Sequence, residues 1–245
     1  NYINNHYSKI AYENPFVDPQ HDIINTFEKL RFYGGFDGKF ATKTNYKIAV
    51  DYSMITDQPF YYLFKYVYPD PNTVPSPSVA DNDFDVLYDD LDLLKFNVEI
   101  FHAAFDKMNL LISGNYYVYK LDSEEEAWNM PDWDATFSLD YQISEQLNVS
   151  TDLFFTGQRK ALLLETFGFD PRPLSYDDLM GFSATQKSVY NLPVVFDLNF
   201  NANYKITEQF SVFAQLSNFG FQKYQRWLGY PVQSFNVLGG LSYGF

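Results

Sequence analysis

Residues 196–219 read FDLNFNANYKITEQFSVFAQLSNF, and apolar and polar side chains alternate strictly along the first ten of them. One face of an extended chain would carry Phe196, Leu198, Phe200, Ala202 and Tyr204. The other face would carry Asp197, Asn199, Asn201, Asn203 and Lys205. Because successive side chains of a β-strand point to opposite faces, the stretch predicts a strand with one apolar and one polar face. A soluble β-sandwich and a transmembrane β-barrel both use such strands, with opposite faces toward water.

The same alternation recurs along the chain, and helical spacing has no comparable support anywhere. Together with the opening stretch it predicts about nine strands. The further alternating segments are 29–40, 45–54, 94–102, 109–120, 132–143, 147–156, 209–219 and 235–245.

Short and long connections also alternate between these segments. The short ones, which carry residues favoured in tight hairpins, are 41–44, 105–108, 144–146 and 206–208. The long ones lie near 67–92, 121–131, 160–189 and 220–233. A barrel with short turns at one rim and long, extracellular loops at the other produces this pattern. If the chain ends at the rim with the short turns, counting back through the alternating connections places the N-terminal segment 1–27 at the long-loop rim.

Composition excludes several classes of protein. The formal net charge is −14, whereas a nucleic-acid-binding surface needs clustered Lys and Arg. The absence of cysteine excludes disulfide scaffolds, zinc ribbons and thiol catalysis. No apolar run is long enough for a membrane-spanning helix. The first residues show no signal peptide, which fits a mature or truncated protein.

The make-up of the two faces favours the barrel. The polar face is built mostly from Asn, Ser, Thr, Gln and Asp with few Lys, whereas the apolar face is rich in aromatics near strand ends. Aromatic rings at the headgroup boundary, flanking an apolar band, are typical of a barrel with a wet lumen. We therefore expect residues 1–245 to form a single all-β, antiparallel transmembrane barrel region in the outer membrane of a Gram-negative bacterium. Its lumen-facing polar residues would include Asp134, Asp140, Asp152, Asp197, Asn199 and Asn201. The alternative is a soluble β-sandwich, which would need no detergent.

The expected count of nine or ten strands indicates whether these residues could form a whole barrel. Barrels of this kind have an even number of strands with both termini at the periplasmic rim. An odd count that begins on the loop side favours the C-terminal part of a larger barrel. The alternative is that residues 2–12 form one more strand.

The last residues of the chain, KYQRWLGYPVQSFNVLGGLSYGF at 223–245, carry a recognisable pattern. They resemble the C-terminal signature of TonB-dependent receptor-type barrels from Bacteroidota. The matching positions are Trp227, Tyr230, Pro231, Phe235, Asn236, Gly239, Gly240, Tyr243 and Phe245. Upstream stretches such as ENPFVDPQHDIINT look similar to the same group, although the tail is the most specific part.

The resemblance implies a barrel that carries a nutrient or other ligand across the outer membrane. It also implies partners: outer-membrane lipid and lipopolysaccharide, TonB, and the barrel-insertion machinery, which would read Tyr243 and Phe245. Two features depart from the family. Its barrels have about 22 strands, within the known range, and these residues include no plug domain. The alternative function is a plug-less scaffold subunit in a multi-protein outer-membrane complex.

Several loop residues are candidates for binding. The aromatics Trp128, Tyr224, Trp227 and Tyr230 suit contact with a carbohydrate or peptide, or else pack the loops together. The apolar run Ala161–Leu164 could extend a strand or dock another protein.

Metal and catalytic signals are weak. Asp81, Asp83 and Asp85 have a spacing that could hold Ca²⁺, but the segment lacks the Gly and Glu of an EF-hand loop, and a solvated acidic loop explains it as well. The lumenal carboxylates have no accompanying His cluster, because His6, His21 and His102 are scattered. We therefore expect no enzymatic activity and no cofactor.

Overall fold

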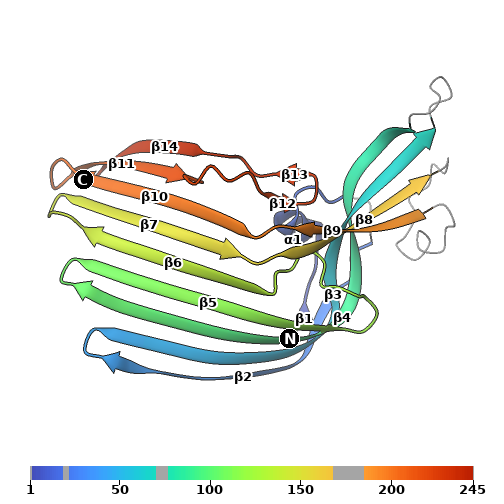
Figure 1. Ribbon diagram of the computed structural model, residues 1–245, viewed down its shortest axis with the longest axis horizontal. Helices are drawn as coiled ribbons and strands as arrows, with labels where there is room; N and C mark the ends of the chain where they lie inside the picture. Colours follow the sequence, from blue (N-terminus) through green and yellow to red (C-terminus); the bar gives the residue numbers. More distant parts are fainter. Residues whose placement is uncertain (1, 19–21, 70–76, 168–184, 245) are drawn as a thin grey trace.

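The computed structural model describes residues 2–18, 22–69, 77–167 and 185–244, and within these the side chains of 66–69, 77–82 and 167 are not described. Its main feature is one large curved sheet in which most strands are antiparallel (Figure 1). The order across the sheet is β1-β2-β3-β4-β5-β6-β7-β10-β11-β14; β8 and β9 attach beside β3, and β12 and β13 form a separate hairpin. The elements are β1 (Tyr2–Ile3), α1 (Tyr7–Glu13), β2 (Thr26–Ala41), β3 (Thr44–Pro69), β4 (Pro77–Phe105), β5 (Met108–Leu121), β6 (Trp133–Gln142), β7 (Leu147–Thr156), β8 (Arg159–Phe167), β9 (Thr185–Leu192), β10 (Val195–Lys205), β11 (Phe210–Ser217), β12 (Gln225–Trp227), β13 (Tyr230–Pro231) and β14 (Asn236–Tyr243).

Four tight connections lie together at one end of the sheet, which we call the short-turn end (Figure 1). They join β2 to β3, β4 to β5, β6 to β7 and β10 to β11, as the sequence predicts. The C-terminus lies at the same end. The longer connections and the N-terminal segment lie at the opposite end, the loop end. The sheet therefore has the two unlike rims that a barrel wall requires.

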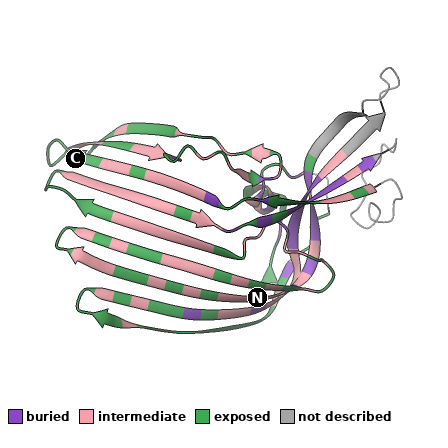
Figure 2. Ribbon diagram, in the orientation of Figure 1, coloured by how far each residue is buried: buried purple, intermediate pink, exposed green. Residues whose placement is uncertain are grey.

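The alternation of the sequence becomes two unlike faces of the sheet. One row of directly paired residues on the apolar face crosses from β2 to β10: Phe36, Ile48, Val98, Gly114, Ala135, Phe155 and Phe196. Among the described residues no layer covers this face, and Phe36 is 62% exposed and Leu241 70% (Figure 2). Soluble monomers rarely expose an apolar patch of more than about a few hundred Å². A β-sandwich would bury this face against a second sheet, and the described residues contain no such sheet.

The buried residues gather instead at the loop end (Figure 2). There β3 and β4 continue past the large sheet, and β8 pairs in parallel with β3, with Leu63 opposite Leu163. We call the outer halves of β3 and β4 together with β8 and β9 the rim sheet. One of its faces packs on the N-terminal segment and Trp227, and the other packs on Trp128. The members of the first cluster are Ile10, Val17, Tyr61, Leu63, Phe84, Val86, Leu163 and Trp227; those of the second are Phe60, Tyr62, Leu87, Leu91, Trp128, Leu162 and Leu164.

The rim sheet differs from the sequence expectation of long connections near 67–92 and 160–189. Much of both regions is strand, because β4 begins at Pro77 and β8 runs from Arg159 to Phe167. The run Ala161–Leu164 is the strand extension, and each of its side chains is at most 3% exposed. It is therefore part of a core and is not free to dock another protein.

The N-terminal segment contains a helix that the alternation did not predict. α1 begins after His6, whose ring nitrogen accepts a hydrogen bond from the backbone N–H of Lys9, and its one buried residue is Ile10. Residues 2–12 therefore do not form one long strand. Of these residues, only the two of β1 pair with β2. No helix in the described part of the chain is long and apolar enough to cross a membrane.

Candidate functional site

The connection between β5 and β6, residues 122–132, folds back over the loop end of the sheet and is fastened there by a buried carboxylate. Asp89 is 7% exposed. Its carboxylate oxygens accept hydrogen bonds from the backbone N–H groups of Asp90 at 2.9 Å, Ser123 at 3.0 Å and Glu124 at 2.8 Å. A carboxylate that satisfies several backbone donors holds them in a fixed arrangement.

The far side of the same connection is tied to the rim sheet. The Asn129 backbone N–H donates to the carbonyl of Lys160 at 2.7 Å, and its side-chain amide donates to the carbonyl of Tyr61 at 2.7 Å. Trp128 is 1% exposed, and its indole N–H donates to Glu124 at 2.8 Å. The connection is thus a rigid wall and not a free loop.

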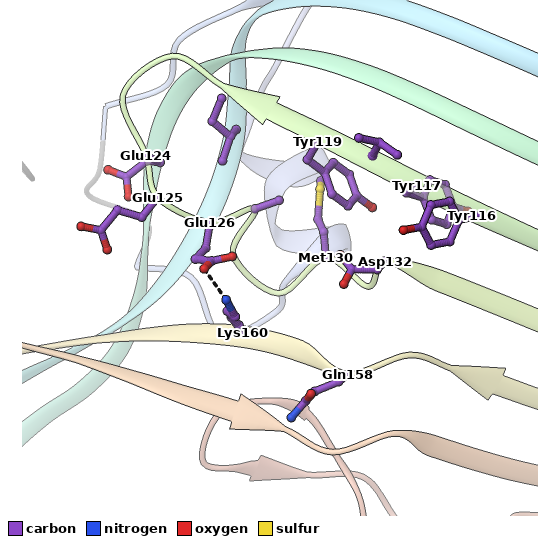
Figure 3. A pocket seen from close by; sticks show the side chains of 13 residues that line it. Tyr116, Tyr117, Tyr119, Glu124, Glu125, Glu126, Met130, Asp132, Gln158 and Lys160 are labelled. Atoms are coloured by element: carbon purple, nitrogen blue, oxygen red, sulfur yellow. Dashed lines mark hydrogen bonds and ion pairs between the residues drawn. The ribbon is translucent and has the colours of Figure 1, made fainter.

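Between this connection, β5 and the start of β8 lies a pocket with a volume of about 500 Å³, which we call the mouth pocket (Figure 3). The rings of Tyr117 and Tyr119 stand parallel at its side, with centroids 6.0 Å apart and planes inclined by 13°. Their hydroxyls are engaged: Tyr117 donates to Asp134 at 2.7 Å and Tyr119 donates to the carbonyl of Pro131 at 2.9 Å. The two rings are therefore held in place. The other lining residues are Tyr116, Val118, Leu121, Glu124, Glu125, Glu126, Ala127, Met130, Asp132, Gln158 and Lys160.

The polar face of the sheet leads from this pocket toward the short-turn end. All six polar residues that the sequence places in the lumen lie on this face, because Asp140 faces Ser150, Ser150 faces Asn201, and Asp152 faces Asn199 across neighbouring strands. They take part in a hydrogen-bonded network. Its bonds include Asn115 to Asp134 at 2.8 Å, Ser138 to Asp152 at 2.6 Å, Asn148 to Asp140 at 3.3 Å, the Asn218 N–H to Asn199 at 3.0 Å, and Asn201 to Ser150 at 3.4 Å.

A second polar cluster lies at the loop end near β12. Arg159 is 8% exposed and donates hydrogen bonds to the carbonyls of Gln225 at 2.7 Å and Arg226 at 2.8 Å. Burial, followed by the nearby charge of Arg226, lowers the pKa of Arg159. Tyr224 donates to Asp197 at 2.8 Å, and burial, followed by this hydrogen bond, raises the pKa of Tyr224 to about 12. These contacts fix the β12–β13 hairpin against the sheet.

Of the four loop aromatics predicted as ligand contacts, Trp227 and Tyr230 are paired in the β12–β13 hairpin and Tyr224 directly precedes it, whereas Trp128 lies on the other face of the rim sheet. Trp128 and Trp227 are buried in the two rim clusters, so they pack the loops together. Tyr230 stacks on Phe16 with ring centroids 3.9 Å apart, and Tyr224 bonds to Asp197. The aromatics that do line the mouth pocket, Tyr116, Tyr117 and Tyr119, lie in segment 109–120, which the sequence predicts only as a strand. The alternate spacing of Tyr117 and Tyr119 next to an acidic connection is the signal that could have identified them.

The remaining sequence candidates are distributed as follows. The side chain of Asp81 lies outside the described residues, and Asp85 accepts hydrogen bonds from Tyr62 at 2.9 Å and from the Val86 N–H. Within the described ranges, no three acidic or histidine side chains come together in a group that could hold a metal ion. His102 pairs with Thr44 at 2.8 Å near the short-turn end. Tyr243 ends β14, whereas Phe245 lies outside the described residues.

Comparisons with known proteins identify the fold. No protein-family model matches the chain, and no curated protein matches its sequence. Among solved structures it is similar to the pyoverdine outer membrane receptor FpvA from Pseudomonas aeruginosa PAO1, with a TM-score of 0.59 and 11% identity over 90% of this chain and 30% of the receptor. It is similar to the siderophore receptor PirA from Acinetobacter baumannii, with a TM-score of 0.60 and 14% identity over 91% of this chain and 32% of that one. It is also similar to the copper transporter OprC, with a TM-score of 0.57 and 11% identity over 90% and 31%.

The chain therefore spans less than a third of the length of these structures. At this level of identity the likeness shows the fold: an all-β, mostly antiparallel sheet that matches part of an outer-membrane receptor barrel. The sheet is not closed into a barrel by the described residues. At one end β1 pairs only with Thr26 and Phe27 of β2, at the other end lies β14, and neither β1 nor β2 pairs with β14.

Proposed function

We propose that this chain is part of the wall of a TonB-dependent receptor-like barrel in the outer membrane of a Gram-negative bacterium, and that the barrel carries a nutrient or other ligand inward. The observation that carries the proposal is the pairing of an uncovered apolar face with a hydrogen-bonded polar face that starts at the mouth pocket. The apolar face suits lipid, and the polar face suits a water-filled lumen. The C-terminal motif supports a source among the Bacteroidota.

Closure of the barrel requires further strands. β2 and β14 both run from the loop end to the short-turn end. Neighbouring strands in these barrels are antiparallel, so β2 cannot close directly on β14. An open edge in lipid would leave backbone N–H and C=O groups unpaired, and each unpaired group would cost about 3 kcal/mol. An odd number of additional strands between β14 and β2 would pair the backbone groups of both edges. This agrees with the interpretation of the chain as the C-terminal part of a larger barrel.

The partners follow from the same arrangement. The apolar face would contact outer-membrane lipid and lipopolysaccharide, and the insertion machinery would read the end of β14 at Tyr243 together with Phe245. TonB would supply energy for uptake. The charge of the chain argues against nucleic acid, and transport of this kind needs no enzymatic step.

The scaffold alternative is weaker than the sequence suggests. One of its two supports was the apolar run Ala161–Leu164 as a docking surface, and that run is buried in the rim sheet. Its other support, a barrel without a plug, depends on the protein as a whole.

The test is uptake in cells. A strain that lacks the gene is grown on a panel of single nutrients, metals and metal chelates, beside a strain that lacks TonB. Transport predicts a growth defect on one compound that both strains share and that the intact gene restores. Growth without any shared defect, together with stoichiometric co-purification of other outer-membrane subunits, would favour the scaffold.

A further inference from the structure

We propose that the mouth pocket binds a small organic cation with an ammonium or guanidinium group. This inference rests on the proposed function, because it names the chemical class of the ligand held at the same pocket. Three features of the lining carry it: its charge, its aromatic side and the spread of its carboxylates.

The lining has a surplus of negative charge. Glu124, Glu125, Glu126 and Asp132 contribute carboxylates, and Lys160 contributes the only ammonium among the described lining residues. Lys160 pairs with Glu126, and Lys187 reaches Glu125 from outside the lining at 3.5 Å. The side chain of Asp132 is exposed and forms no hydrogen bond or ion pair with another described residue. An anionic ligand would be repelled here, and a cation would find an unpaired carboxylate.

The aromatic side of the pocket suits a cation. Tyr117 already carries an ammonium of the chain itself, because Lys95 Nζ lies 5.5 Å from the centroid of its ring. A cation within about 6 Å of a ring centroid is attracted by the electrons of the ring face. Tyr119 stacks against Tyr117 and stands at the pocket beside Met130 (Figure 3). Because both hydroxyls are engaged, the rings keep this orientation without a ligand.

The arrangement of the carboxylates favours an extended organic cation over a metal ion. Calcium needs six to eight oxygen ligands that converge on one point. In the described part of the chain no acidic cluster meets that need, so the carboxylates of the lining surround the pocket without converging. The volume of about 500 Å³ exceeds that of a bare ion and falls within the range of pockets for small molecules.

The test uses the intact protein, extracted in detergent from its native membrane, and isothermal titration calorimetry with matched probes. Both probes are N-acetylated so that the α-amine carries no charge. N-Acetyl-L-argininamide, called argininamide below, carries a guanidinium group, and N-acetyl-L-citrullinamide, called citrullinamide below, has nearly the same shape with an uncharged urea. We expect saturable binding of argininamide and at least about tenfold weaker binding of citrullinamide, as removal of one favourable charge interaction implies. Calcium chloride and sodium citrate serve as the metal and anion probes, and both should bind more weakly than argininamide.

Variants then locate the site. Asp132→Asn should weaken argininamide binding about twofold to fivefold, in line with the loss of one exposed charge contact. Tyr119→Leu should weaken it as well. The matched control is Glu145→Gln, which removes an exposed carboxylate at the short-turn end and should leave binding unchanged. Heat-modifiable mobility on gels checks that each variant is still a folded barrel.

Equal affinity for the two amides, tighter binding of calcium or citrate, or an equal effect of Glu145→Gln would overturn the inference. The outcome is separable from that of the proposed function. A nutrient taken up in a TonB-dependent manner without any binding of argininamide would refute only the cation. Binding of argininamide by a protein whose deletion causes no uptake defect would refute only the transport.

Discussion

The wall of the mouth pocket depends on Asp89, and the substitution Asp89→Asn tests that dependence. The carboxylate accepts hydrogen bonds from three backbone N–H groups, two of which belong to Ser123 and Glu124 at the start of the connection. An amide keeps one oxygen and turns an NH₂ group toward donors that need an acceptor. At least one hydrogen bond to a charged group is lost, and such a bond is worth about 1.5–3 kcal/mol.

The expected consequence is local opening of the connection. A loss of about 3 kcal/mol corresponds to amide exchange roughly 100-fold faster wherever exchange requires that opening. The assay is hydrogen–deuterium exchange with mass spectrometry on peptides that cover residues 119–131. Asp122→Asn is the control, because Asp122 is an exposed neighbour whose side chain does not bond the connection. Unchanged exchange at Ser123 and Glu124 in Asp89→Asn, or equal acceleration in the control, would refute the reasoning.

Three further predictions concern the loop end. Arg159→Met removes the donors to Gln225 and Arg226 and should release the β12–β13 hairpin by about 1.5–3 kcal/mol, which limited proteolysis of residues 218–235 would detect; an unchanged cleavage rate would contradict it. Leu162→Ala, at a position with 0% exposure, should destabilise the rim sheet by about 2–5 kcal/mol in urea unfolding followed by Trp fluorescence, and a shift no larger than that of an exposed substitution would count against the core assignment. Because the pKa of Tyr224 is raised in the folded protein to about 12, its contribution to stability is present below about pH 10, the ordinary tyrosine value, and is lost as the pH rises through 12; an alkaline absorbance titration of Tyr224→Phe should lack that late transition, and an unaltered titration curve would contradict the assignment.

The regular part of the sheet was predictable from the sequence because one physical pattern determines it. A strand with lipid on one side and a wet lumen on the other must alternate, and residues 132–143 and 196–205 do so without a break. The tight turns at the short-turn end followed from the same segments. The six polar residues predicted to face the lumen could be placed on one face of the sheet by parity alone.

The rim sheet was not predictable in the same way because it is buried on both faces. A strand buried on both faces has no polar face, so Ala161–Leu164 is a continuous apolar run that could equally dock a partner. Its parallel pairing with β3 joins residues about a hundred positions apart, such as Leu63 and Leu163, and local pattern says nothing about such pairs. The short helix α1 packs through a single buried side chain, Ile10, and so leaves little periodic signal.

The candidate site was also predictable from the sequence only in part. Exposed aromatics in loops suggested ligand contacts, yet Trp128 and Trp227 proved to be the core of those loops. A large aromatic ring gains more from burial than from exposure, and burial is decided by neighbours distant in the chain. The pocket itself forms where residues 122–132 fold back against β8, through contacts such as Asn129 to Lys160, and no local pattern encodes that contact.

The assignment of the two faces to lipid and to water is the central claim, and site-directed spin labelling tests it most directly. The chain has no cysteine, so single substitutions such as Phe200→Cys and Asn201→Cys label neighbouring positions of β10 without a background. In native membranes we expect the label at 200 to collide mainly with dissolved oxygen and the label at 201 mainly with a water-soluble nickel complex. Equal access of the nickel complex to both labels, or the reverse order, would contradict it.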